Sequence, residues 1–143
     1  MIYFTFYLVT LTKTTVKKPD QALPVSIIIC AHDEEQNLRE LIPILLNQNH
    51  PEFEIIVVDG RSNDGTFDLL LQETSKDHRL RMVHVNRTPQ LFNTKKYALT
   101  LGIKSAKYEW LLLTDADCRP TSKEWIRSIA KHFSPTNQFV LGF

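Results

Sequence analysis

The chain has 143 residues, of which 43% are hydrophobic and 23% charged, and this is the length and composition of one soluble globular domain with its own core. Its formal net charge of +1 gives no sign of a nucleic-acid or acidic partner, so none is expected. The two cysteines, Cys30 and Cys118, lack the Cys/His spacing of a zinc site. We expect two reduced, half-buried thiols, and a disulfide at a shared sheet edge is the alternative.

Residues 1–12 are apolar and aromatic and stand apart from the rest of the chain. The stretch is shorter than the roughly 20 residues that span a bilayer, and it lacks the basic leader and cleavage site of a signal peptide. Three interpretations stay open: the remnant of a membrane helix, an interfacial anchor, or an extra edge strand. Residues 13–23 are predicted to be a polar linker. Its lysines are typical of a cytoplasmic flank, so we expect a cytoplasmic protein, including one at the cytoplasmic face of the plasma membrane.

From residue 24 onward the hydrophobic pattern alternates between the periods of strands and helices. Short runs of β-branched or other apolar residues predict strands, and longer segments with an apolar stripe predict helices. In chain order these are a strand at residues 25–30, a helix at 34–47, a strand at 54–58, a helix at 66–75, a strand at 81–85, a helix at 94–105, a strand at 109–114, a helix opening at 120–124 and the start of a strand at 139–143.

Three details of the helices follow from single residues. Asp64 or Thr66 is the expected cap of the helix at 66–75. Gly102 is expected to allow close packing of the third helix. Thr121 and Glu124 have the spacing of a capping box and predict the start of the fourth helix.

The repeated β-α-β pattern predicts right-handed crossovers and therefore a mostly parallel sheet with helices on both faces. The expected fold class is α/β, Rossmann-like, with one domain over residues 24–143. A strand that only begins at 139–143 predicts that this domain is incomplete and that the parent protein continues.

Polar residues follow three of the predicted strands: residues 31–35, residues 59–66, and the pair Asp115 and Asp117. The carboxyl ends of parallel strands meet at one edge of a sheet, where open α/β sheets bind ligands. Taken singly, each cluster is explained by a helix cap, a turn or an ordinary polar loop. Their coincidence at one edge favours a binding site.

The chemistry of this predicted site is suggested by charge. Asp115 and Asp117 stand one residue apart and would repel each other unless a cation lies between them. Mg²⁺ prefers one or two carboxylates together with substrate phosphates, so the pair suggests a metal-bound phosphate ester. Lys95, near the start of a predicted helix, can meet a phosphate as a point charge. Adjacent lysines, here Lys95 and Lys96, more often mark a solvated face.

Four segments, in order along the chain, resemble family 2 glycosyltransferases. They are PVSIIICAHDEEQNL at residues 24–38, FEIIVVDGRSNDGT at 53–66, KKYALTLGI at 95–103 and the Asp-x-Asp signature at 115–117. The resemblance implies a glycosyltransferase A fold and an inverting enzyme that takes a sugar from a nucleotide diphosphate sugar, usually UDP-linked. The acceptor, whether glycan, lipid or protein, is not implied.

The resemblance also implies roles for individual residues. The loop after the first strand and the acid after the second hold the base and ribose, here Ala31, His32, Glu34 and Asp59. Asp115 is implied to approach the ribose and the metal, and Asp117 to bind Mg²⁺ or Mn²⁺. Such a cation neutralises the diphosphate leaving group as the glycosidic bond breaks.

The sequence departs from the family pattern in three ways. His32 stands where many relatives have an aromatic residue. Gly60 stands where many have a second acid, so Asp59 must replace that acid or the nucleotide preference differs. Arg61, the next residue, is a candidate for a phosphate contact. No carboxylate after Asp117 fits the base that an inverting transfer needs, so we expect the donor-binding half of the enzyme, with little or no transfer activity alone.

Other classes of function stay open at this point. A phosphotransferase or phosphatase of the haloacid dehalogenase type would use Asp115 as nucleophile. In that class the motif normally lies on the first strand and is followed by Thr or Val where Arg119 stands here. A non-catalytic receiver-like module would fit the length and fold, but its expected switch Thr and Lys are missing. A pseudo-enzyme with a purely structural role is the third alternative.

Overall fold

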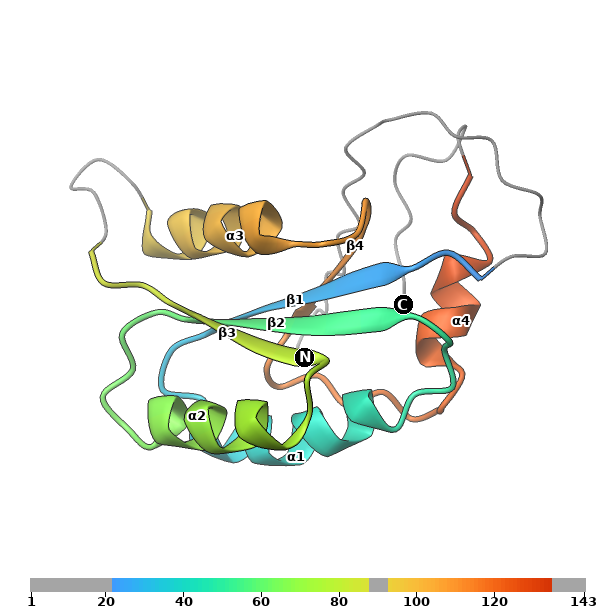
Figure 1. Ribbon diagram of the computed structural model, residues 1–143. Coiled ribbons are helices and arrows are strands. Elements are labelled where there is room, and N and C mark those ends of the chain that lie inside the picture. Colours follow the sequence, from blue (N-terminus) through green and yellow to red (C-terminus); the bar gives the residue numbers. More distant parts are fainter. Residues whose placement is uncertain (1–21, 88–92, 135–143) are drawn as a thin grey trace, which may run out of the picture.

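Four parallel strands form the centre of the computed structural model, which describes residues 22–87 and 93–134 (Figure 1). Neighbouring strands pair in parallel in the order β3-β2-β1-β4. Their bounds are β1 (Val25–Ala31), β2 (Phe53–Asp59), β3 (Leu80–His84) and β4 (Trp110–Asp115). Each predicted strand in the described part of the chain is confirmed. The predictions for residues 1–12 and 139–143, and most of the linker at 13–23, lie outside the described residues.

Helices cover both faces of this sheet. Figure 1 shows α1 and α2 on one face and α3 on the other. The helix bounds are α1 (Glu35–Leu46), α2 (Thr66–Lys76), α3 (Thr94–Ser105) and α4 (Trp125–Ala130). The predicted α/β, Rossmann-like architecture is therefore confirmed. In the described part of the chain, no helix has the length and apolar character needed to cross a membrane.

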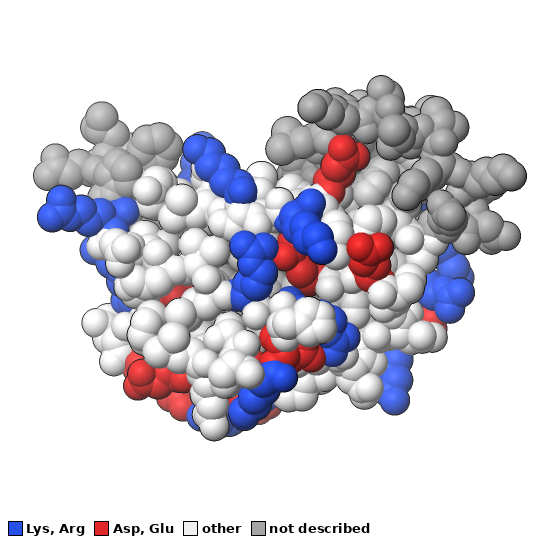
Figure 2. Space-filling model, viewed as in Figure 1, with Lys and Arg blue, Asp and Glu red and all other residues white. Residues whose placement is uncertain are grey.

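The strands are apolar on both faces because each face packs against helices. Ile27 and Ile29 lie in the core that includes the apolar stripes of α1 and α2 and Ile126 of α4. Ile28, whose side chain points the opposite way, packs on the α3 side. On the surface, Figure 2 shows acidic and basic side chains intermingled over the viewed face, as expected for a net charge of +1.

The start of α4 differs from the prediction. The helix begins at Trp125, and Glu124 at its N-cap makes no side-chain capping bond, so the predicted capping box is wrong. The cap comes instead from Gln48, which is buried in the loop between α1 and β2. Gln48 Oε1 accepts from the Ile126 N–H at 3.2 Å, and its Nε2 donates to the Ser122 carbonyl at 2.9 Å. A side chain distant in the sequence thus makes the hydrogen bond at the helix end that Thr121 and Glu124 were expected to make.

The close packing expected at Gly102 is confirmed. A Cβ at this position would lie 2.6 Å from Ile28 Cγ2 and 3.0 Å from Val58 Cγ2, both of which belong to strands under α3. Because α3 rests on the sheet at this point, Gly102 sets how closely the helix approaches β1 and β2.

We therefore predict that Gly102→Ala destabilises the protein. Overpacking a well-filled core costs about 1–3 kcal/mol, which exceeds the gain of up to about 1 kcal/mol from the better helix propensity of alanine. Urea denaturation measures the free energy of unfolding. Lys104→Ala, at an exposed position of the same helix, is the control and should change it by less than about 0.5 kcal/mol. A Gly102→Ala variant as stable as the control would show that α3 does not rest tightly on the sheet.

Candidate functional site

A pocket of about 610 Å³ opens at the carboxyl edge of the sheet, between the ends of β1, β2 and β4 and the first turn of α3. This volume falls within the range of about 300–1,000 Å³ typical of small-molecule sites. The lining residues come from four segments of the chain: Cys30, Ala31, His32, Glu34, Gly60, Arg61, Thr94, Lys95, Ala98, Asp115, Ala116 and Asp117.

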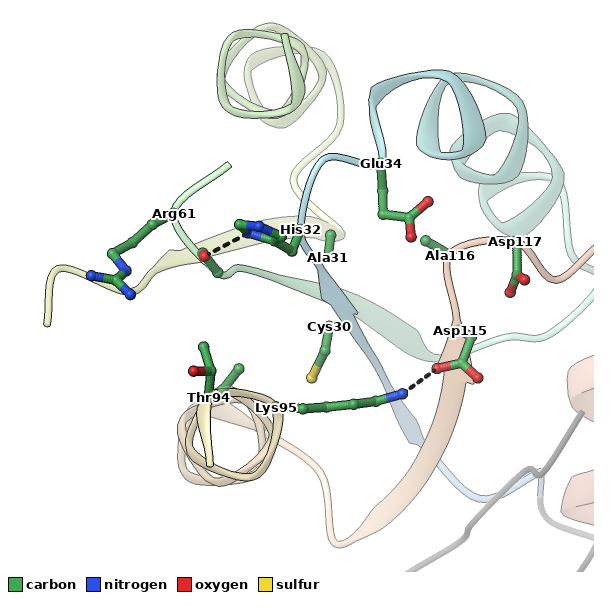
Figure 3. Close-up of a pocket in the computed structure, with 12 residues that line it drawn as sticks. Cys30, Ala31, His32, Glu34, Arg61, Thr94, Lys95, Asp115, Ala116 and Asp117 are labelled. Atoms are coloured by element: carbon green, nitrogen blue, oxygen red, sulfur yellow. Dashed lines mark hydrogen bonds and ion pairs between the residues drawn. The ribbon is translucent and has the colours of Figure 1, made fainter. Parts of the chain in front are cut away.

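The structure brings most of the predicted site residues to this pocket. Figure 3 shows Lys95 and Asp115 reaching toward each other across one end, with His32 and Arg61 toward the other. The predicted residues that line the pocket are Ala31, His32, Glu34, Arg61, Lys95, Asp115 and Asp117. Asp59 is the exception and is not part of the lining.

The register of the sheet explains why Asp115 and Asp59 differ. Residues paired across parallel strands point to the same face, and Asp115 pairs with Cys30, on the face that α3 covers. Asp59 pairs with Ala31, which lies in the core on the opposite face. Asp115 therefore meets Lys95 of α3 in the pocket. Asp59 points to the opposite face of the sheet.

Asp59 is fully buried and holds the loop that follows β2. Its Oδ1 accepts from Ser62 Oγ at 2.5 Å and from the Ser62 N–H at 3.2 Å. Its Oδ2 lies 2.7 Å from His84 Nδ1 at the end of β3. Both oxygens are thus engaged by protein groups, and the implied contact of Asp59 with a base has no counterpart in this arrangement.

Asp33 ties the loop after β1 to the loop after β2. Its Oδ1 accepts from the N–H groups of Asn63 at 2.6 Å and Asp64 at 3.3 Å. Its own N–H donates to Ser62 Oγ at 3.0 Å. Asp33 has a φ of 55°, in the left-handed region that aspartate tolerates better than most residues. The Asp33 side chain therefore binds the loop after β2 and does not cap α1, whose N-cap is Glu34.

The loop after β2 and the first residue of α2 in turn cap the start of α1. Thr66 Oγ1 accepts from the Glu34 N–H at 2.9 Å, and Asp64 Oδ2 accepts from the Glu35 N–H at 3.2 Å. Asp64 Oδ1 also accepts from the Thr66 N–H at 2.9 Å, but the N-cap of α2 is Gly65 and Thr66 is its first residue, so neither predicted residue occupies the cap position. The two pocket loops consequently form one hydrogen-bonded unit, which we call the loop clasp (residues 33–35 with 62–66).

His32 projects from this unit into the pocket. Its Nδ1 lies 2.9 Å from the Gly60 carbonyl oxygen, and because a carbonyl only accepts, Nδ1 must carry the proton. The side chain is 61% exposed, so the ring face is available to a ligand. Gly60 itself donates its N–H to Ala31 O at 2.8 Å, and a Cβ there would lie 3.2 Å from that oxygen. The position where many relatives carry an acid is thus tightly packed here.

The two acids after β4 differ in their surroundings. Asp115 Oδ1 lies 3.4 Å from Lys95 Nζ, and both side chains are largely exposed, so the ion pair is a weak one that a ligand can replace. The exposed Asp117 carboxylate makes no hydrogen bond or ion pair within residues 22–87 and 93–134. No group of three or more His, Cys, Asp or Glu side chains in those residues could hold a metal. A divalent cation at Asp115 and Asp117 fits only if a ligand such as a phosphate supplies further oxygens.

Cys30 lies in the pocket wall beside this pair. Burial is the main cause that raises the pKa of its thiol to about 11. Lys95 lowers this pKa by a smaller amount, and Asp115 raises it slightly. Burial also raises the pKa of Cys118. Both cysteines are free, as predicted, and the alternative disulfide is not formed.

Two residues near the acids escaped the sequence analysis as site residues. Arg119 donates to the carbonyls of Ala116 and Cys118, and Asn37 of α1 donates to Glu34 Oε2 at 2.6 Å. Arg119 lies outside the four segments that resemble the family, and Asn37 lies in the first of them but was given no role. Only the spatial approach of α1 to the end of β4 reveals their contacts.

Comparisons with known proteins agree with this architecture. The family model described as "Glycosyl transferase family 2" matches residues 26–143. Poly-beta-1,6-N-acetyl-D-glucosamine synthase from Staphylococcus epidermidis is 32% identical over 95 residues, which are 65% of this chain and 21% of that protein. An uncharacterized glycosyltransferase from Haemophilus influenzae is 30% identical over 116 residues, 81% of this chain and 34% of that protein. The chain thus spans between about a fifth and a third of the length of these curated relatives.

Solved structures show the same fold. The mannosyltransferase PcManGT from Pyrobaculum calidifontis, in complex with GDP-Man and Mn²⁺, has a TM-score of 0.72 at 22% identity and covers 85% of this chain and 35% of its own. TarS 1-349 of S. aureus, in complex with UDP-GlcNAc, has a TM-score of 0.63 at 24% identity, with coverage of 76% and 30%. The expected glycosyltransferase A type of Rossmann-like fold is therefore confirmed.

The loop clasp generates a stability prediction at Asp33. Asp33→Ala removes the acceptor for two backbone N–H groups and places an ordinary residue at positive φ, so we expect a loss of about 1–2 kcal/mol in the free energy of unfolding. Asp33→Asn keeps an acceptor oxygen and the tolerance for positive φ and should lose less than about 0.5 kcal/mol. Chemical denaturation of both variants checks this, and equal losses would contradict the role given to Asp33.

Proposed function

The chain belongs to glycosyl transferase family 2, and on that premise we propose that its pocket binds a nucleotide diphosphate sugar with a divalent cation, as the donor site of an inverting glycosyl transfer. A UDP-sugar is the proposed donor. The observation that carries this proposal is the convergence of the implied donor-site residues other than Asp59, from segments far apart in the sequence, on one pocket of about 610 Å³.

The diphosphate is proposed to lie at the end of the pocket formed by Lys95, Asp115 and Asp117. Lys95 supplies a point charge from the first turn of α3, where the positive end of the helix dipole also favours an anion. When a diphosphate arrives, Lys95 can exchange its weak contact with Asp115 for a phosphate oxygen. That exchange frees the Asp115 carboxylate beside Asp117.

The residues around the two acids suit a cation that arrives with its nucleotide. Asp117 and Asp115 would hold it, and the phosphates would complete its set of oxygen ligands. When bound, the cation would neutralise negative charge on the diphosphate leaving group. In support, the neighbours described above were solved with GDP-Man and Mn²⁺ and with UDP-GlcNAc.

The base and ribose are proposed to occupy the other end, along His32, Glu34 and Arg61. The exposed face of His32 offers a stacking surface, and its ring is oriented by the Gly60 carbonyl. Arg61, exposed and held at a φ of 62°, adds a positive charge at this end. Asp59 acts here only through the loop that it holds.

A binding titration tests the proposal. We expect UDP to bind in the presence of Mn²⁺ and to bind at least about 10-fold more weakly when Mn²⁺ is omitted or Asp117 is changed to Asn, because the cation bridges the carboxylate and the phosphates. Isothermal titration calorimetry measures both effects, and parallel titrations of UDP-glucose and GDP-mannose compare donors.

The control variant is Asp68→Asn, which removes an exposed carboxylate from α2 rather than from the pocket and should bind UDP like the wild type. Nucleotide binding that is independent of the metal would contradict the proposal. So would binding of beryllofluoride, a phosphoryl mimic, without any binding of UDP, since that result favours a phosphorylated aspartate.

A further inference from the structure

We propose that Arg119 is a positioning residue: its guanidinium fixes the turn at residues 115–118 against α1, so that Asp117 is in place before a cation arrives. That Arg119 fixes the turn is inferred from its contacts alone, whereas its link to metal binding rests on the proposed function. Arg119 does not line the pocket and acts through the backbone that carries the acids.

Asp115 and Asp117 lie on a tight turn. The Cys118 N–H donates to the Asp115 carbonyl at 3.2 Å, which closes the turn around Ala116 and Asp117. The Asp117 side chain is exposed and makes no hydrogen bond or ion pair with the described residues. Its position therefore depends on the backbone of the turn, and whatever fixes that backbone fixes the carboxylate.

Arg119 holds the turn on both sides of Asp117. Its Nη1 donates to Ala116 O at 3.0 Å and to Cys118 O at 2.8 Å. These are the carbonyls that precede and follow the residue carrying the proposed metal ligand. Because one nitrogen binds both, the backbone on either side of Asp117 cannot turn away without breaking a charge-assisted hydrogen bond.

The other side of the guanidinium is anchored to α1. Nε and Nη2 each lie 3.1 Å from Glu40 Oε2, and Nη2 also donates to Asn37 Oδ1 at 3.0 Å. All five N–H donors of the planar group are thereby engaged. A lysine has three donors on a single nitrogen and cannot reach both carbonyls and both α1 side chains from one position.

The same network reaches the facing wall of the pocket. Asn37 accepts from Arg119 through Oδ1 and donates through Nδ2 to Glu34 Oε2 at 2.6 Å. Figure 3 shows the Glu34 side chain directed toward the side of the pocket where Ala116 and Asp117 lie. Arg119 thus couples the turn to Glu34 as well as to α1. The Arg119–Glu40 pair is partly exposed, so its stabilisation of the fold is small and its effect is mainly on geometry.

Arg119→Lys and a matched control, Arg79→Lys, test the inference. Arg79 also makes a two-nitrogen contact with a carboxylate, that of Asp77, but it lies between α2 and β3 at the opposite edge of the sheet. The first readout is hydrogen exchange of the Cys118 amide in the metal-free chain. We expect it to be at least about 10-fold faster in Arg119→Lys than in Arg79→Lys, with similar urea midpoints for the two variants, because the fixed turn protects this amide.

The second readout is UDP affinity with and without Mn²⁺. Residues that orient metal ligands typically contribute about 10–100-fold to metal affinity. We therefore expect Arg119→Lys to weaken Mn²⁺-dependent UDP binding about 10-fold or more and to leave Mn²⁺-independent binding unchanged. A general loss of structure would instead weaken both and lower the urea midpoint.

The outcomes separate this inference from the proposed function. Wild-type exchange at Cys118 in Arg119→Lys would overturn the positioning role whatever the pocket binds. Faster exchange with unchanged Mn²⁺-dependent affinity would overturn its link to the metal. If the wild-type chain does not bind UDP with Mn²⁺, the proposed function fails, and the exchange comparison still decides whether Arg119 fixes the turn.

Discussion

The parallel pairing of β1 with both β2 and β4 is the constraint on which the pocket depends. Ala31 pairs with Asp59 and Cys30 with Asp115, so three strands end together and deliver their loops to one edge of the sheet. The same register decides the direction of each last side chain. It turns Asp115 toward α3 and Lys95, and it turns Asp59 toward the opposite face.

The three pocket segments that follow β1, β2 and β4 are each held by polar groups from another segment. Asp33 binds the amides of the loop after β2, and that loop caps α1 in return. Arg119 joins the turn after β4 to α1. These contacts cross between segments, so displacing one of these loops requires breaking hydrogen bonds to another. A site built in this way is preorganised for a charged ligand, because little ordering is left to be done on binding.

Much of this arrangement could be predicted from the sequence. The strands are apolar runs, α1 and α2 carry clear apolar stripes and α3 a weaker one, and the polar runs at strand ends identify the ligand edge. The failures share a physical cause. Thr121 and Glu124 form a local capping-box pattern, but Gln48 caps the start of α4 instead. Gln48 lies 78 positions before Ile126, whose amide it binds. Arg119 was not recognised as a site residue because two of its partners, Asn37 and Glu40, lie far away in the sequence on α1. The direction of Asp59 follows from strand register, which hydrophobic periodicity alone does not define.

In the proposed donor site, Asp117 and a nucleotide diphosphate hold one divalent cation between them. A crystal structure of the chain grown with UDP and Mn²⁺ tests this most directly, because Mn²⁺ is located by its anomalous scattering. We expect an anomalous peak about 2.0–2.3 Å from an Asp117 carboxylate oxygen, a typical oxygen-ligand distance for such cations, with phosphate oxygens of UDP around the same ion. UDP bound in the pocket with no Mn²⁺ at Asp117, or Mn²⁺ bound elsewhere, would contradict it.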